Sequence, residues 1–220
     1  MSNLFMISTL RSGLLVIFVA LPLMASAAGS AHDLVQDTTN DILAALSTNK
    51  EQYKKYPTKL YDALNTIVGP AVDTEGISRS IMTVRYSRKA TTSQMQRFRK
   101  NIKIAMFQLY GTALLEYNGH GITIGPAKEE LGDRTSIGIA VRGNNGTIYP
   151  VQYTMDRING EWKLRNVIIN GINIGKMLRD QFSESMQRNG NNLDETISIW
   201  GGEVDKTKEE PDKYTGDNNQ

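Results

Sequence analysis

Residues 104–117 read IAMFQLYGTALLEY, and this stretch decides the fold. Its only strongly polar members, Gln108, Thr112 and Glu116, recur every four residues, so on a helix they form one narrow stripe. The rest of the helix surface is apolar or small. A helix of this composition must be covered on nearly all sides by a sheet, by other helices or by an apolar ligand. Whatever covers it determines what the protein does.

The N-terminus has the three parts of a secretory signal peptide. Arg11 supplies a positive charge, residues 13–23 form an apolar stretch, and Ala25-Ser26-Ala27 is a small-x-small cleavage site. The alternative is an uncleaved membrane anchor, but about 11 apolar residues are too few for a spanning helix, which needs roughly 20. We therefore expect residues 1–27 to be a cleaved signal peptide and the mature chain to be exported and soluble.

The composition excludes several classes of function. The 220-residue chain has 25 basic and 23 acidic side chains, and this balance does not favour binding to nucleic acid. The absence of cysteine excludes disulfides, thiol catalysis and cysteine-based metal sites. We expect a single domain over residues 28–202, followed by a polar and disordered tail over residues 203–220.

Helical spacing of apolar residues dominates the first half of the mature chain. It predicts helices over about 31–47, 57–68 and 76–84, with Pro57 at the start of the second and Gly69-Pro70 after its end. A long helix follows, for which Thr91-Thr92-Ser93 offers caps and which runs to Glu116. A later helix is predicted over 174–188, followed by one or two helical turns around Leu193, Ile197 and Trp200.

Between these helical segments the pattern changes to alternation. Apolar residues alternate over 122–124, 137–141 and 151–155, and a fourth run begins at Trp162 and continues to residue 169. Residues 143–146 and Asn159-Gly160 supply tight turns. The predicted class is therefore α+β, with helices packed on a twisted four-stranded antiparallel sheet.

Candidate catalytic residues are few. The two histidines are His32 and His120, and no second metal ligand is evident near His120, so a solvated turn residue is the simpler interpretation. Asp156 and Asn166 could serve a small isomerase- or hydrolase-like pocket. We nevertheless expect no metal site and no enzymatic activity.

Positive charge is concentrated between Gly76 and Leu115, where no Asp or Glu occurs. This stretch is either an ordinary solvated face or a docking surface for phosphate headgroups, an anionic membrane or an acidic partner. We take Arg97, Arg99 and Lys100 as its candidate docking residues.

An ordered set of segments runs through the mature chain: Phe98, Tyr110 with residues 113–117, residues 150–153, residues 160–171 and residues 179–182. This set resembles the periplasmic phospholipid-binding MlaC family, also called the toluene-tolerance auxiliary proteins. The resemblance covers about residues 32–201. Asn166 stands where the family usually has Asp, and Asn173 stands where it often has Ser.

The resemblance implies a sheet related to the nuclear-transport-factor-2-like fold, with an apolar cavity between the sheet and its helical cover. It further implies a monomeric shuttle in the periplasm of a Gram-negative bacterium, which maintains the lipid asymmetry of the outer membrane. The implied partners are an inner-membrane ABC transporter complex with its lipid-binding MCE-type subunit, and an outer-membrane lipoprotein–porin complex. Phospholipid would be its cargo, and no cofactor is implied.

Burying a 16-carbon acyl chain is worth on the order of 10 kcal/mol, whereas a charged headgroup is costly to bury and should remain at the mouth of the cavity. A dry core requires the same residue types as a lipid slot, and the isomerase-like enzyme and a lipid-free periplasmic adaptor remain as alternatives. We expect acyl chains to contact Met106, Leu109, Tyr110, Leu114, Ile139, Val141, Val151, Tyr153, Ile169 and Ile172.

Overall fold

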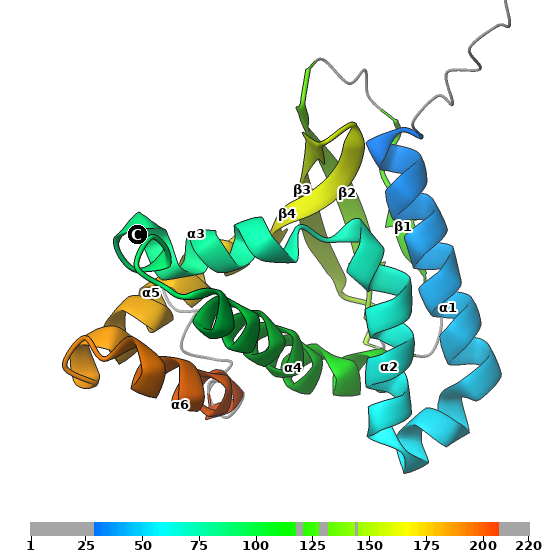
Figure 1. The fold of residues 1–220 in the computed structure, drawn as a ribbon. Helices are drawn as coiled ribbons and strands as arrows, with labels where there is room; N and C mark the ends of the chain where they lie inside the picture. Colours follow the sequence, from blue (N-terminus) through cyan, green and yellow to red (C-terminus); the bar gives the residue numbers. More distant parts are fainter. Residues whose placement is uncertain (1–28, 118–120, 128–131, 144, 207–220) are drawn as a thin grey trace, which may run out of the picture.

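The structure is a computed structural model that describes residues 29–117, 121–127, 132–143 and 145–206. It is an α+β fold in which helices surround one twisted sheet (Figure 1). The predicted signal peptide, His120 and residues 207–220 lie outside the described residues. None of the helices in the described part combines the length and apolar composition that a membrane crossing requires.

Two N-terminal helices form an antiparallel pair at one side of the molecule (Figure 1). Helix α1 (Ala31–Lys55) starts at a capping box made by Ser30 and Asp33 and bends at Asn49, so it continues past the predicted end at residue 47. Helix α2 (Pro57–Val68) has the predicted bounds, because proline fits the first turn. A single 3-10 turn, η1 (Gly69–Ala71), follows it.

Two further helices connect this pair to the opposite side of the molecule. Helix α3 (Thr74–Ser87) is capped by Asp73 and kinked at Thr83, and it is longer than the predicted segment 76–84. Helix α4 (Thr92–Glu116) begins within the predicted cap segment, ends at the predicted residue and contains the apolar stretch discussed above. It packs on different helices along its length, as the hydrophobic clusters below show.

The sheet has five antiparallel strands in the order β1-β2-β3-β4-β5, so the expectation of four was wrong. The fifth strand is only two residues long and follows a turn in which Asn170 and Gly171 both have positive φ, as a type I′ hairpin requires. The strands are β1 (Ile122–Ile124), β2 (Arg134–Arg142), β3 (Ile148–Ile158), β4 (Glu161–Ile169) and β5 (Ile172–Asn173).

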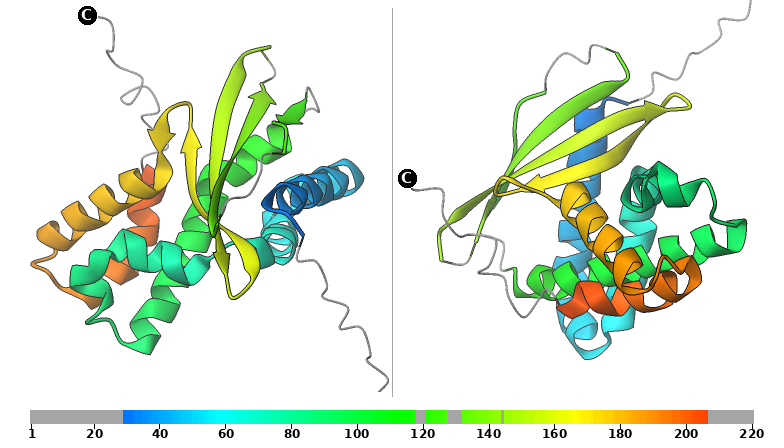
Figure 2. Two further views of the ribbon diagram at one scale, coloured as in Figure 1. Left: turned by 90° about the horizontal axis from the view of Figure 1, so that it is seen from above. Right: turned by 90° about the vertical axis from the view of Figure 1, so that its left-hand side faces the viewer.

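The last two helices lie on the opposite side of the molecule from α1 (Figures 1 and 2). Helix α5 (Ile174–Arg188) has the predicted bounds, and the Asn173 side chain caps it by accepting a hydrogen bond from the Lys176 backbone N–H at 2.9 Å. Helix α6 (Leu193–Lys206) exceeds the predicted turn or two and extends into the segment that we expected to be a disordered tail.

The apolar side chains form three separate clusters rather than one core. The first joins α3, α4, α5 and α6 around Phe98, Phe182 and Trp200. A second joins the start of α1 to the sheet, and a third joins α1, α2 and the C-terminal half of α4. A chain that buries its apolar surface in three places leaves space where the three clusters meet.

Candidate functional site: an apolar cavity beneath the sheet

A cavity of about 410 Å³ lies where the three clusters meet. Such a volume is within the range of small-molecule sites in proteins, which is roughly 300–1,000 Å³. Helices α1 to α5, the η1 turn and strands β3 and β4 contribute to its wall, and every cluster supplies some of it. The apolar lining residues are Ile42, Tyr61, Leu64, Val68, Val72, Ile77, Ile102, Met106, Phe107, Tyr110, Leu114, Tyr153, Leu164, Val167, Ile174 and Leu178.

Helix α4 forms one long side of the cavity. Lys103, Met106, Phe107, Tyr110 and Leu114 line it at helical spacing, so they occupy one face of the helix. From Lys103 to Leu114 the helix rises by about 16 Å. The apolar surface that the sequence places on this helix is therefore covered in part by a cavity rather than by protein.

Three tyrosines, Tyr61, Tyr110 and Tyr153, contribute hydroxyl groups to this largely apolar wall. Burial raises the pKa of both Tyr110 and Tyr153, so both remain uncharged at neutral pH. Tyr110 nevertheless keeps 37% of its surface exposed, which indicates that the cavity reaches the exterior beside it.

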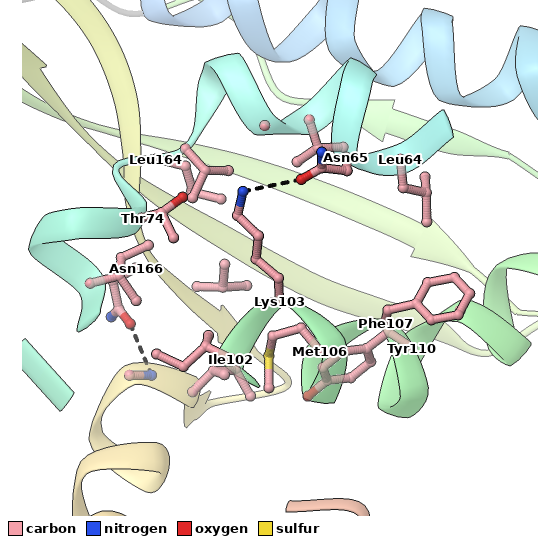
Figure 3. Close-up of a pocket in the computed structure, with 18 of the residues that line it drawn as sticks. Leu64, Asn65, Thr74, Ile102, Lys103, Met106, Phe107, Tyr110, Leu164 and Asn166 are labelled. Atoms are coloured by element: carbon pink, nitrogen blue, oxygen red, sulfur yellow. Dashed lines mark hydrogen bonds between the residues drawn. The ribbon is translucent and has the colours of Figure 1, made fainter. Parts of the chain in front are cut away.

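A polar pair lies at the rim of the cavity between α2 and α4. The Lys103 Nζ donates a hydrogen bond of 3.1 Å to the Asn65 Oδ1, and both residues line the cavity (Figure 3). Because this hydrogen bond is exposed to solvent, it marks a second point at which the cavity reaches the surface.

Arg165 contributes the other charged group of the lining, and it is positioned by a β-bulge. The pairing of β3 with β4 shifts between Thr154 and Met155, which leaves Arg165 without a partner on β3. Its guanidinium forms ion pairs with Asp73 and, at 3.4 Å, with Asp156. Gly76 makes room for this pair, since a Cβ at that position would overlap the Arg165 guanidinium and displace it.

The floor beside α5 depends on a similar close approach. The Gly175 backbone N–H donates a hydrogen bond of 3.1 Å to the Asn166 Oδ1, and both residues line the cavity (Figure 3). A Cβ on Gly175 would lie 2.5 Å from that oxygen, so only glycine allows the contact. The Asn166 amide is thus used to join β4 to α5.

Comparisons with known proteins agree with this architecture. The sequence profile of the MlaC protein family matches residues 36–201. The chain belongs to the MlaC family. It is 61% identical over 207 residues to the toluene tolerance protein ttg2D of Pseudomonas putida, which covers 94% of this chain and 96% of that protein.

A solved structure shows the same fold at low sequence identity. It is a phospholipid-binding protein from Ralstonia solanacearum in complex with a phospholipid, and it is 18% identical to this chain with a TM-score of 0.73. The match covers 82% of this chain and 99% of the solved one.

The structure brings together four of the ten residues that we expected to contact lipid in this MlaC protein. Met106, Tyr110, Leu114 and Tyr153 line the cavity, whereas the Leu109 side chain lies outside the described part. The other predicted residues lie away from its lining. Ile139, Val141 and Val151 pack in the cluster between α1 and the sheet, Ile169 pairs with Val151 and Ile172, and Ile172 lines a smaller pocket beside α5.

Two of the three candidate docking residues already have acidic partners in the MlaC protein. Arg97 forms an ion pair with Asp194 on α6, and Arg99 forms one with Glu75 on α3, while Lys100 is exposed. None of the three lines the cavity. Lys103, one turn further along α4, does line it, and its spacing from Met106, Phe107 and Tyr110 is the sequence signal that would have identified it.

The candidate catalytic residues give little support for an enzyme. Arg134 and Arg165 both pair with Asp156, and the hydrogen bond from Arg134 is the main cause that lowers the pKa of this carboxyl. Asp156 does not line the cavity, and His32 bonds to the Gly125 carbonyl oxygen at 3.0 Å. Within the described residues, no three His, Asp or Glu side chains gather in a way that could hold a metal ion.

Proposed function

We propose that this protein is a non-enzymatic phospholipid carrier that holds acyl chains in the cavity between α4 and the sheet. The observation that carries the proposal is an apolar space of about 410 Å³ that the side chains of three clusters leave open. The phospholipid bound to the Ralstonia solanacearum protein of the same fold supports the same ligand class here. Met106, Tyr110, Leu114 and Tyr153 are the proposed contacts for the acyl chains.

The physical advantage of such a carrier is large. Each methylene that leaves water for an apolar site contributes about 0.8 kcal/mol, so an acyl chain crosses water slowly by itself. A phosphate group loses its hydration when buried, so it remains at the rim.

We propose that the signal peptide exports the chain to the periplasm. There it shuttles lipid as a monomer between an outer-membrane lipoprotein–porin complex and an inner-membrane ABC transporter with its MCE-type subunit, and so preserves outer-membrane lipid asymmetry.

The test is mass spectrometry of organic extracts from the purified protein, paired with two tryptophan substitutions. Val68→Trp places a large ring in the cavity, whereas Val84→Trp is the matched control, because Val84 is 61% exposed on α3 and does not line the cavity. We expect phospholipid in near-stoichiometric amount from the wild type and from Val84→Trp, and at least a tenfold lower amount from Val68→Trp.

An extract of the wild type without phospholipid would refute the carrier proposal. Equal lipid in Val68→Trp and Val84→Trp would place the lipid elsewhere on the protein. Circular dichroism of both variants establishes that a loss of lipid does not reflect a loss of fold.

A further inference from the structure

The cavity lining contains two cations, and they differ in how their charge is balanced. Arg165 forms ion pairs with Asp73 and Asp156, so its charge is compensated within the protein. Lys103 has a neutral partner instead, the Asn65 amide oxygen. Among the described residues, no carboxylate is paired with Lys103. One cation at the rim of an apolar cavity is therefore available to an anion.

The position of Lys103 suits a ligand with an anionic end and a long apolar end. Met106, Phe107 and Tyr110 follow it along the cavity-lining face of α4, and Leu114 ends that face about 16 Å away. A chain that leaves the Lys103 ammonium and runs along α4 therefore meets apolar surface throughout (Figure 3).

The present partner of Lys103 is also the kind that an anion displaces. The bond from the Lys103 ammonium to Asn65 has one charged partner, whereas a phosphate oxygen carries a negative charge and adds Coulomb attraction that the neutral amide oxygen lacks. A phosphate oxygen therefore competes well with a side-chain amide oxygen at an exposed rim, and Asn65 can return to solvent without leaving a buried polar group unpaired.

We propose that the Lys103 ammonium binds the phosphodiester of the carried lipid and that Asn65 holds this side chain in place while the site is empty. The inference rests on the proposed carrier function and adds to it the position and charge requirement of the headgroup. Lys103 thereby favours phospholipids over neutral diacylglycerols of the same chain length.

The experiment exploits the fact that two substitutions remove the same hydrogen bond, whereas only one removes the charge. Lys103→Met abolishes both the bond and the cation, and Asn65→Ala abolishes only the bond. Delipidated protein is titrated calorimetrically with dioctanoyl phosphatidylglycerol and with dioctanoylglycerol, which lacks the phosphate. Lys100→Met is the matched control, because Lys100 is an exposed cation on the same helix outside the cavity.

We expect Lys103→Met to weaken phosphatidylglycerol binding about tenfold while diacylglycerol binding is unchanged. Asn65→Ala and Lys100→Met should retain wild-type affinity for both lipids. Asn65→Asp provides an independent variant that keeps Lys103, and the added carboxylate should weaken phosphatidylglycerol binding alone.

Equal losses in Lys103→Met and Asn65→Ala would overturn the inference, because the bond would then matter and the charge would not. Wild-type phosphatidylglycerol affinity in Lys103→Met would overturn it too, and would leave the carrier function intact. A wild-type protein that binds neither lipid would refute the carrier function itself.

Discussion

Thr83 shows how one residue can carry strain in an otherwise regular helix. Its φ of 61° and ψ of 165° lie in a region that is essentially restricted to glycine, and a β-branched side chain makes this conformation costly. The kink leaves the next residue, Val84, 61% exposed, while Ile81 and Met82 just before it are buried. Packing of the residues before the kink therefore holds the backbone at Thr83 in place.

We expect Thr83→Gly to stabilise the protein. Glycine adopts the native backbone angles without strain, and the relief should exceed its greater entropy in the unfolded chain by about 1 kcal/mol. Urea unfolding of the wild type, Thr83→Gly and Thr83→Ala measures the effect. Alanine keeps a Cβ and should gain little, so a destabilised Thr83→Gly protein would show that the positive φ carries no strain.

Residue patterns in the sequence predicted part of the cavity. Met106, Tyr110 and Leu114 were among the apolar residues expected to contact acyl chains, and they share one helix face. Their helical spacing, extended back by one turn, could have selected Lys103. Lys103 was missed because charge alone grouped the candidates, and charge does not show which cations already have partners. Arg97 and Arg99 are paired with Asp194 and Glu75, which are distant in sequence.

The elements themselves followed closely from local chemistry. Helices α2 and α5 have their predicted bounds because Pro57 and Asn173 are strong start signals. Strand β5 was missed because two residues are too short to show alternation. Alternation in β2 and β3 also showed which residues share the inner face of the sheet. It cannot show which part of that face is covered by helix α1 and which part lines the cavity. Ile139 and Val151 lie in the part that α1 covers.

A cross-strand pair between β2 and β3 gives a pH-dependent contribution to stability. Arg134 lies opposite Asp156 and donates hydrogen bonds of 2.7 and 2.9 Å to its carboxylate, which lowers the pKa of that group. A lowered pKa in the folded state adds stability above the pKa of the unfolded chain, about 3.9, and this stability is lost as the pH falls through the folded value.

We expect Arg134→Gln to lower the free energy of unfolding by about 0.5–1 kcal/mol at neutral pH, a modest amount because Arg134 is largely exposed. The difference from the wild type should shrink as the pH falls through the lowered pKa of folded Asp156, because the carboxyl loses its charge there. Urea unfolding at neutral pH and at an acid pH below that lowered pKa measures it, with exposed Arg142→Gln as the control. A deficit that is the same at both pH values would mean that the pair acts through packing rather than through charge.

If the proposed lipid occupies the cavity, we expect the molecule as a whole to gain part of its stability from this ligand. The cavity lining lacks contact partners when empty, and a ligand that binds only the folded state stabilises it by RT ln(1 + [L]/Kd). The three clusters are joined across the cavity by α4 and by β4, so a lipid that touches all of them adds contacts between parts that otherwise meet little.

We therefore expect removal of lipid to lower the melting temperature of the protein by several degrees, since about 2.7 kcal/mol is lost when a ligand present at 100 times its Kd is withdrawn. Differential scanning calorimetry of the extracted and the reloaded protein measures the shift. Val68→Trp fills the space with its own ring and should melt at a temperature that does not depend on added lipid. A wild type that melts at one temperature in both states would contradict this expectation.

The irregularity at Arg165 has a consequence for the entire sheet. Before it, the even-numbered Trp162 and Leu164 turn toward the interior, and after it the odd-numbered Val167 and Ile169 do so. The additional residue therefore exchanges the inward-facing and outward-facing positions in the middle of β4. As a result, side chains before and after Arg165 face the same side of the sheet, and Val167 still pairs with Tyr153. Deleting this single position would turn an indole and a leucine out into water, a greater loss than any substitution there would cause.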